Sequence, residues 1–97
     1  MRFRFTAPIW EWGAQGGWYF VTLPDEAASD IREVPRMPRG FGSVRVRVTV
    51  GATTWSTSVF PDSKSGSYVL PVKKAVRTAE GIGDGDDVDV SLDVLDV

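Results

Sequence analysis

Hydrophobic and polar residues alternate along much of this chain, which is the pattern of strands with one buried face. The clearest case is the segment 43–50, where valine occupies every second position and serine, arginine or threonine stands between. The segments 2–7 and 88–94 alternate in the same way, and the segments 18–23 and 54–60 are rich in aromatic and β-branched residues. Such residues fit the half-buried surface of a sheet, so we expect a strand in each of these five segments.

Turn residues separate the strands. Pro8 is expected to end the first one. Gly51-Ala52 fits a tight hairpin with glycine at its first central position. The polar segment 61–66 and the segment 84–86, Asp-Gly-Asp, are expected to form a loop and a turn, and 67–70 is expected to form a short sixth strand.

Two other segments have helical spacing. Pro24 suits the first position of a helix, and the acids Asp25 and Glu26 suit the positive end of its dipole. Its apolar stripe, at spacings of four and three residues, consists of Ala27, Ile31 and Val34. Pro35 is expected to end this helix.

A second helix is expected to open at Pro71, as the first opens at Pro24. Gly81 suits the position that follows the last helical residue, and Ile82 is expected to pack back on the last turn. The apolar stripe of this helix consists of Val72, Ala75, Val76 and Ala79.

The two helical regions belong to an internal sequence similarity, which we call the echo. The segment 17–24 leads to a helix, a loop and an alternating strand, and the segment 66–71 begins the same succession. Two strand–helix–strand units, each with an extra strand, predict a barrel with pseudo-twofold symmetry, in which each half closes the open edge of the other. The alternative is a chance likeness between short β segments. We expect one domain over residues 1–97, mostly β, with about six strands and two short helices.

The composition limits the chemistry. The 97 residues include no cysteine and no histidine, which excludes disulfides and cysteine nucleophiles and removes the commonest general base and metal ligand. Three aspartates, at 84, 86 and 87, lack the spacing of an EF-hand calcium loop. We therefore expect no catalytic residue, no metal and no cofactor. No apolar run is long enough to span a bilayer and the start of the chain is no signal peptide, so we expect a cytoplasmic protein that enters no membrane.

Charge is distributed unevenly. All eleven lysines and arginines precede Glu80, and this part of the chain also holds six acids, so its charge is about +5. The residues from Glu80 onward hold seven acids and no base. Two interpretations stay open: a basic surface for an anionic partner, or two halves that cancel within one sheet. For the second, we predict that Asp87, Asp89 and Asp93 lie beside a basic-faced strand. The candidates are Arg2 and Arg4, or Arg45 and Arg47.

Three cations mark a candidate site. Lys73, Lys74 and Arg77 lie opposite the apolar stripe of the second helix, and we expect them to bind an anion or another ligand with help from Trp12, which stands in a glycine-rich loop. Two further arginines, Arg36 and Arg39, add charge in a loop whose position the sequence does not specify. The alternative is a solvated helix face. The tryptophans form either a stacking platform or part of the core: Trp10, Trp12, Trp18 and Trp55.

The chain also resembles a known family. The segments 68–77 and 81–90 are similar to the end of a bacterial and archaeal family called domain of unknown function 1905. The segment 5–9 resembles its opening strand, 17–24 its strand entering the first helix, and 43–60 its central hairpin. The resemblance covers nearly the whole chain and implies a double-split β-barrel. Because the family has no established activity, it implies no site residues.

A looser resemblance links the segment 66–88 to swapped-hairpin transcription factors of antitoxin and transition-state-regulator type, which bind DNA as intertwined dimers. This chain holds both halves in one polypeptide and has a net charge of −2, which disfavours DNA binding. We expect a binding or regulatory module for a protein or a small ligand. A nucleic-acid-binding domain and an enzyme with an unrecognised site are the alternatives, and the oligomeric state is open.

Overall fold

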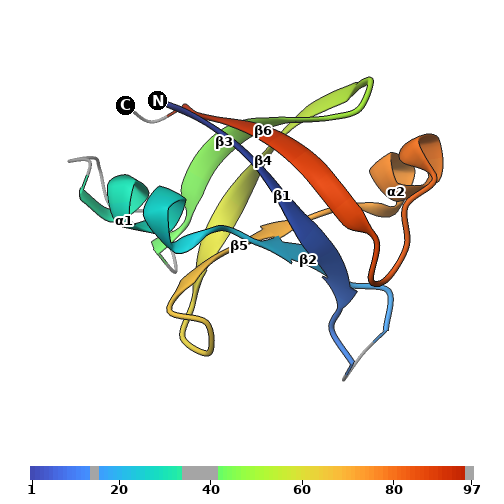
Figure 1. The fold of residues 1–97 in the computed structure, drawn as a ribbon, viewed down its shortest axis with the longest axis horizontal. Coiled ribbons are helices and arrows are strands. Elements are labelled where there is room, and N and C mark those ends of the chain that lie inside the picture. Colours follow the sequence, from blue (N-terminus) through green and yellow to red (C-terminus); the bar gives the residue numbers. More distant parts are fainter. Residues whose placement is uncertain (14–15, 34–41, 96–97) are drawn as a thin grey trace.

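A computed structural model describes residues 1–13, 16–33 and 42–95, and in this part of the chain six antiparallel strands form a closed barrel (Figure 1). The elements are β1 (Arg2–Glu11), β2 (Tyr19–Thr22), α1 (Asp25–Glu33), β3 (Val44–Val50), β4 (Thr53–Asp62), β5 (Ser67–Pro71), α2 (Lys74–Glu80) and β6 (Asp87–Val94). Around the barrel the strands follow the order β1-β2-β5-β4-β3-β6. The predicted mostly-β barrel with two short helices is therefore confirmed.

The barrel has the predicted pseudo-twofold symmetry. Exchanging β1 with β4, β2 with β5 and β3 with β6 leaves the set of paired strands unchanged. Where the halves meet, the N–H of Leu23 donates to the carbonyl of Tyr68, and the N–H of Val72 donates to the carbonyl of Tyr19, each at 2.9 Å. The two bonds occupy equivalent positions in the two halves. The helices consequently lie at opposite ends of the barrel (Figure 1).

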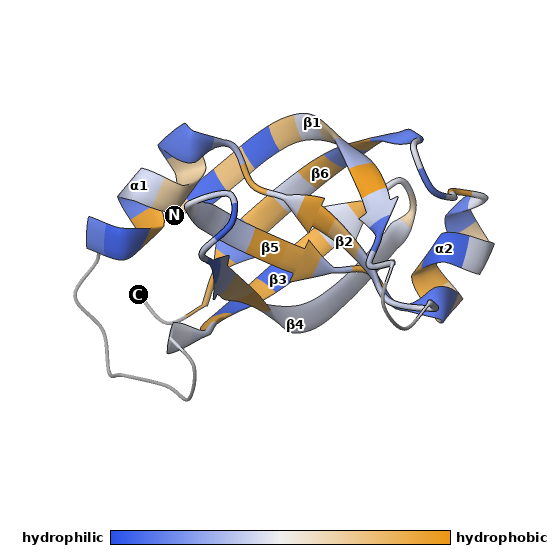
Figure 2. Cartoon of the chain, turned by 90° about the horizontal axis from the view of Figure 1, so that it is seen from below, coloured by the Kyte–Doolittle hydropathy of each residue, from blue (hydrophilic) through white to orange (hydrophobic). Residues whose placement is uncertain are grey.

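The alternating pattern places apolar side chains inside the barrel. The inward-facing valines Val44, Val46 and Val48 of β3 are fully buried, and the arginines between them are not. Figure 2 shows the hydrophobic residues gathered on the strands between the two helices. Each fully buried Val, Leu or Ile contributes about 1.5–3 kcal/mol, which makes this strand pattern the main determinant of the fold.

Pro8 does not end the first strand, contrary to the prediction. It lies inside β1 and pairs with Asp87. The N–H of Ile9 donates to the carbonyl of Asp86 on the β6 side, so the nitrogen of Pro8 faces the other way, at the point where β1 changes partner from β6 to β2. The missing N–H therefore costs no hydrogen bond of the ladder.

Pro71 does not open the second helix, which is also a correction. It is the last residue of β5 and pairs with Phe20, and the backbone stays extended through Lys73, whose φ is −68° and ψ is 159°. Pro24 does lie next to a helix as predicted, since its carbonyl accepts the N–H of Ala28 at 3.1 Å. The residue of the second half that matches Pro24 is therefore Lys73.

The two helices are anchored unequally. Within its described residues α1 buries Ala27, Ala28 and Ile31, in agreement with the predicted stripe; Val34 and Pro35, like Arg36 and Arg39, lie outside the described residues. Helix α2 buries Val76 alone, and the predicted stripe is wrong at Ala75 and Ala79, which are exposed. A helix of 7 residues makes only about two turns, so few of its side chains reach the barrel. In residues 1–13, 16–33 and 42–95 no helix is long and apolar enough to cross a bilayer.

The acidic strand β6 lies between two basic-faced strands, as predicted, because it pairs with both β1 and β3. Asp93 stands opposite Arg2 and Arg47, and its carboxylate forms an ion pair with Arg2 at 2.9 Å. The hydrogen bond from Arg2, and then its charge, hold the pKa of Asp93 below its ordinary value. Asp89 accepts the hydroxyl of Thr6 instead of an arginine, so the charges cancel at one position of the strand and not along all of it.

Candidate functional site

The barrel is split beside α2. Strand β4 pairs with β3 over the residues 53–59 but with β5 only over the residues 60–62, so β4 and β5 part and leave an opening. A pocket of about 310 Å³ lies in this opening. Residues 17–19, 55–57 and 71–74 and Arg77 line it. We call it the α2 cleft.

Arg77 is held in place at the wall of the α2 cleft. Its guanidinium carbon lies 3.9 Å from the ring centroid of Tyr19, a cation–π contact, and its Nε donates to the carbonyl of Val72 at 3.2 Å. A further N–H donates to the carbonyl of Gly17 at 3.5 Å. These contacts tie α2 to the start of β2 and to the residue that follows the end of β5. Because an arginine carries five N–H donors, others remain for a ligand.

Two lysines add charge at the same rim. Lys73, immediately before α2, and Lys74, its first residue, are both exposed. Among the described residues neither forms an ion pair with an acid. Their positive charge is therefore not neutralised within the described part of the molecule, and it adds to that of Arg77.

Aromatic rings form the other part of the wall. Trp18 is 57% exposed, the largest exposure of the big hydrophobic side chains described. Trp55 and Tyr19 are half-buried and pack against the core from the cleft side. A large exposed ring beside fixed cations offers both apolar area and a face for stacking.

Helix α2 is positioned by contacts on its far side. Gly81, with a φ of 64°, caps the helix, and the N–H of Ile82 returns to the carbonyl of Arg77 at 3.0 Å, as predicted. The carboxylate of Glu80 accepts the hydroxyl of Thr53 at 2.7 Å. The same carboxylate fills the space beside Gly51, where an added Cβ would lie 1.9 Å from Glu80 Oε1. The β3–β4 hairpin therefore holds the helix that carries the cations.

The structure brings together three of the four predicted site residues. Lys73, Lys74 and Arg77 all line the α2 cleft, whereas Trp12 does not. Trp12 is 44% exposed in the loop after β1, and its backbone N–H donates to the backbone carbonyl of Trp18 at 2.8 Å. The exposed tryptophan that lines the cleft together with Lys73, Lys74 and Arg77 is Trp18. One signal in the sequence points to it: the echo has Ser67 at the matching position, so an apolar ring there is not needed for the barrel.

Trp10, the remaining tryptophan, belongs to the packing. Its ring lies 5.1 Å from that of Phe20, and its Nε1 donates to the hydroxyl of Thr22 at 3.0 Å. The four tryptophans therefore do not form one platform; two of them, Trp18 and Trp55, line the α2 cleft.

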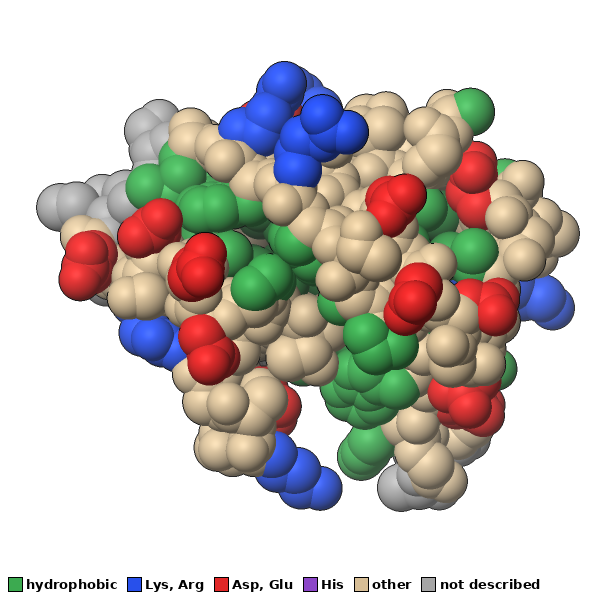
Figure 3. Space-filling view, in the orientation of Figure 1, with side chains coloured by type: hydrophobic (Ala, Val, Ile, Leu, Met, Phe, Trp, Pro, Cys, Tyr) green, Lys and Arg blue, Asp and Glu red, His purple; other side chains and the backbone are tan. Residues whose placement is uncertain are grey.

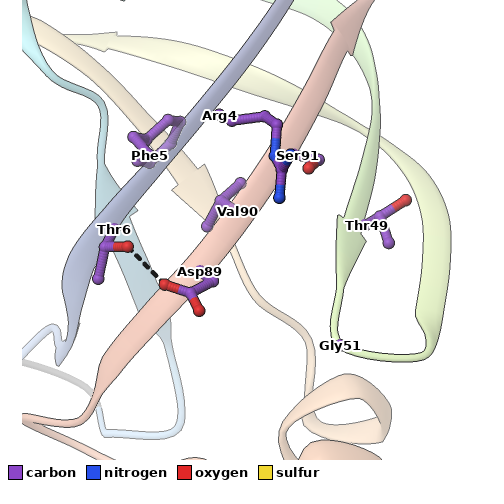
Figure 4. A pocket seen from close by; sticks show the side chains of 8 residues that line it. All are labelled: Arg4, Phe5, Thr6, Thr49, Gly51, Asp89, Val90 and Ser91. Atoms are coloured by element: carbon purple, nitrogen blue, oxygen red, sulfur yellow. Dashed lines mark hydrogen bonds between the residues drawn. The ribbon is translucent and has the colours of Figure 1, made fainter.

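A wider groove of about 690 Å³ crosses the outer face of β1 and β6 and ends at the β3–β4 hairpin (Figure 4). Most of its hydroxyl and carboxylate groups bond to neighbours in the sheet: Thr6 donates to Asp89, and Thr49 bonds to Thr54 at 2.9 Å. Arg4 lies across it (Figure 4). The groove holds one cation, Arg4, and most of its other polar groups already have partners, so the α2 cleft with its three cations is the stronger candidate.

A smaller pocket of about 140 Å³ lies beside α1, where β1 parts from β2. We call it the α1 cleft. Its charged lining residues are Arg4, Glu26 and Asp30. In Figure 3 acidic side chains surround the hydrophobic ones over α1. The two splits of the barrel thus carry opposite predominant charge.

Comparison with known proteins places the sequence in a family. A family model described as "Domain of unknown function (DUF1905)" matches residues 5–92, which include the whole lining of the α2 cleft. The match confirms the resemblance found in the sequence. No curated protein matches the chain.

Proposed function

Because this chain belongs to the DUF1905 family, whose description names no activity, we propose a function from the α2 cleft itself: the protein is a binding module that recognises an anionic partner there. The observation that carries the proposal is the meeting of three cations with the rings of Trp18, Tyr19 and Trp55 around one opening of the barrel.

The physical chemistry of the cleft favours binding. Its volume is at the lower end of the range of small-molecule sites. Arg77 is already oriented by Tyr19 and two carbonyls, so little side-chain freedom is lost when its remaining N–H groups meet a carboxylate or phosphate. The exposed ring of Trp18 gains by being covered. The lining supplies donors, rings and positive charge, which serve recognition.

The test uses three small probes. Phenyl phosphate carries a flat ring and an anion, phenol carries the ring alone, and inorganic phosphate carries the anion alone. We expect phenyl phosphate to quench the tryptophan fluorescence with saturation and to bind more tightly than either of the other two. Raising the salt concentration weakens this binding, because exposed charges are screened.

Matched variants locate the site. Trp18→Ala is expected to weaken phenyl phosphate binding at least fivefold, and Trp12→Ala less than twofold, although both rings are exposed. Lys74→Glu is expected to weaken it at least fivefold, and Lys64→Glu, also exposed but outside the cleft, less than twofold. Binding that is insensitive to Trp18 and Lys74, or no binding of any anionic probe or partner, contradicts the proposal.

We also propose that the module works in the cytoplasm. A chain without cysteine gains nothing from an oxidising compartment, since it forms no disulfide. Fractionation of cells that express the full-length protein tests this directly.

A further inference from the structure

The α2 cleft contains an open strand edge. Over the residues 53–59, β4 has β3 on one side, and its pairing with β5 begins only at Phe60. In the described part of the chain no other strand pairs with the second side of this stretch. The residues 55–57 of this edge line the cleft, so there is free space beside them.

An open edge presents backbone N–H and C=O groups in alternation, and both need partners when they leave water. We propose that the anionic partner is an extended acidic peptide segment of another protein, which enters the split and pairs with β4 as an added strand. This inference rests on the proposed function and names its partner class. It would give the residues 53–59 of β4 a second neighbouring strand.

The side chains around the edge set the pattern of the peptide. Successive side chains of an added strand point to opposite faces. One face meets Trp55 and the buried Val72, and the other meets the rim with Lys73 and Lys74. The cleft therefore fits a segment in which apolar and acidic residues alternate. The rim of the α2 cleft offers such a peptide three cations beside an open strand edge.

A peptide fits better than a single-stranded nucleic acid. Bases stack on exposed rings and phosphates meet lysines, so both partners satisfy Trp18, Lys73 and Lys74. A sugar–phosphate backbone, however, has no regular row of donors for the carbonyls of the edge, whereas a peptide backbone has both donors and acceptors at the right spacing.

The experiment compares peptides that have the same side chains and differ in which backbone nitrogens carry a methyl group in place of hydrogen. The probe is the acetylated and amidated hexapeptide Glu-Val-Glu-Val-Glu-Val, and its controls are two versions with N-methyl groups, one on every valine and one on every glutamate. The unmodified peptide is expected to bind the full-length protein. At least one N-methylated version is expected to bind at least tenfold more weakly, because it lacks the N–H groups that face β4. Amide hydrogen exchange within residues 55–57 is expected to slow at least tenfold on binding.

Two variants complete the test. Lys74→Glu is expected to weaken peptide binding at least tenfold, and Lys64→Glu less than twofold. If both N-methylated peptides bind as well as the parent, or if exchange at 55–57 does not slow, strand addition is wrong. If phenyl phosphate binds and the peptide does not, or if oligodeoxythymidylate binds in its place, the peptide inference fails while an anion-binding cleft stands. If neither the peptide, phenyl phosphate nor the oligonucleotide binds, both proposals fail.

Discussion

The two splits of the barrel, one beside α1 and one beside α2, share a backbone plan and differ in their side chains. The interstrand bonds of Tyr19 and Tyr68 align the halves, and Trp18 then matches Ser67 while Lys74 matches Asp25. The α2 cleft has about 310 Å³ of space and three cations, against about 140 Å³ and two acids with one arginine in the α1 cleft. The backbone symmetry therefore builds two openings, and the side chains decide which of them stays open to a partner.

Ser67 shows how the α1 side is closed. It is buried, and its hydroxyl donates to the carbonyl of Leu23 at 2.8 Å, which ties β5 to the segment that enters α1. Trp18, at the matching position, has no such bond and leaves its ring exposed. The same position therefore stabilises the fold in one half, through Ser67, and in our proposal binds a partner in the other, through Trp18.

The largest expected effect tests the unequal anchoring of the helices. Ile31→Ala removes the largest buried side chain of α1 and leaves a cavity, so we expect a loss of about 3 kcal/mol in the free energy of unfolding. Val76→Ala removes fewer atoms from α2 and is expected to cost about 2 kcal/mol. Urea unfolding measures both. A larger loss for Val76 would mean that α2, and not α1, is the more firmly anchored helix.

The hairpin that supports α2 is tested by two glycines with positive φ. Gly66→Ala meets free space, so it is expected to cost about 1 kcal/mol for the left-handed conformation alone. Gly51→Ala has the same backbone cost and also displaces the carboxylate of Glu80 from Thr53, so it is expected to cost about 1 kcal/mol more. Equal losses in urea unfolding would show that Glu80 does not hold the hairpin against α2.

The two arginine–tyrosine contacts sharpen the comparison further. Arg77 lies 3.9 Å from the ring centroid of Tyr19, and Arg32 of α1 lies 5.8 Å from that of Tyr68 and donates to the carbonyl of Gly66. Because attraction to a ring weakens with distance, Arg77→Ala is expected to cost about 1–2 kcal/mol and Arg32→Ala about 0.5–1 kcal/mol. Thermal unfolding of the two variants measures the difference, and the reverse order contradicts the geometry.

The smallest expected effect is on the stability of the protein at low pH, and it depends on Asp93. Asp93 has a pKa below its ordinary value because Arg2 donates to it, so its contribution to stability is present above the unfolded pKa and is lost as the pH falls through the folded pKa. Below about pH 4, Asp93→Asn is therefore expected to flatten the fall of the unfolding free energy. The control Asp87→Asn, opposite Pro8 on the same strand, is expected to change it less. Urea unfolding at a series of pH values compares them.

Much of this fold could be predicted from local pattern. The valines of β3 alternate so regularly that one buried face follows, and the echo of segments 17–24 and 66–71 indicated the pseudo-twofold barrel. Two boundaries of secondary-structure elements were predicted wrongly, and both involve proline. A proline was expected to break β1 at Pro8 and to open α2 at Pro71, but both lie within strands. At Pro8 the backbone nitrogen faces away from the neighbouring strand, a direction that local sequence does not specify.

The sequence by itself determined the strands, the helices, the two related halves and the cluster of Lys73, Lys74 and Arg77, because each depends on residues near one another in the chain. The tertiary structure decided which rings stand beside those cations. Trp18 and Trp55 come from different halves of the barrel, and they meet Arg77 because β4 parts from β5 after only three paired residues. That separation arises from the pairing of strands that are distant in the sequence. It also creates the open edge of β4 on which the peptide inference depends.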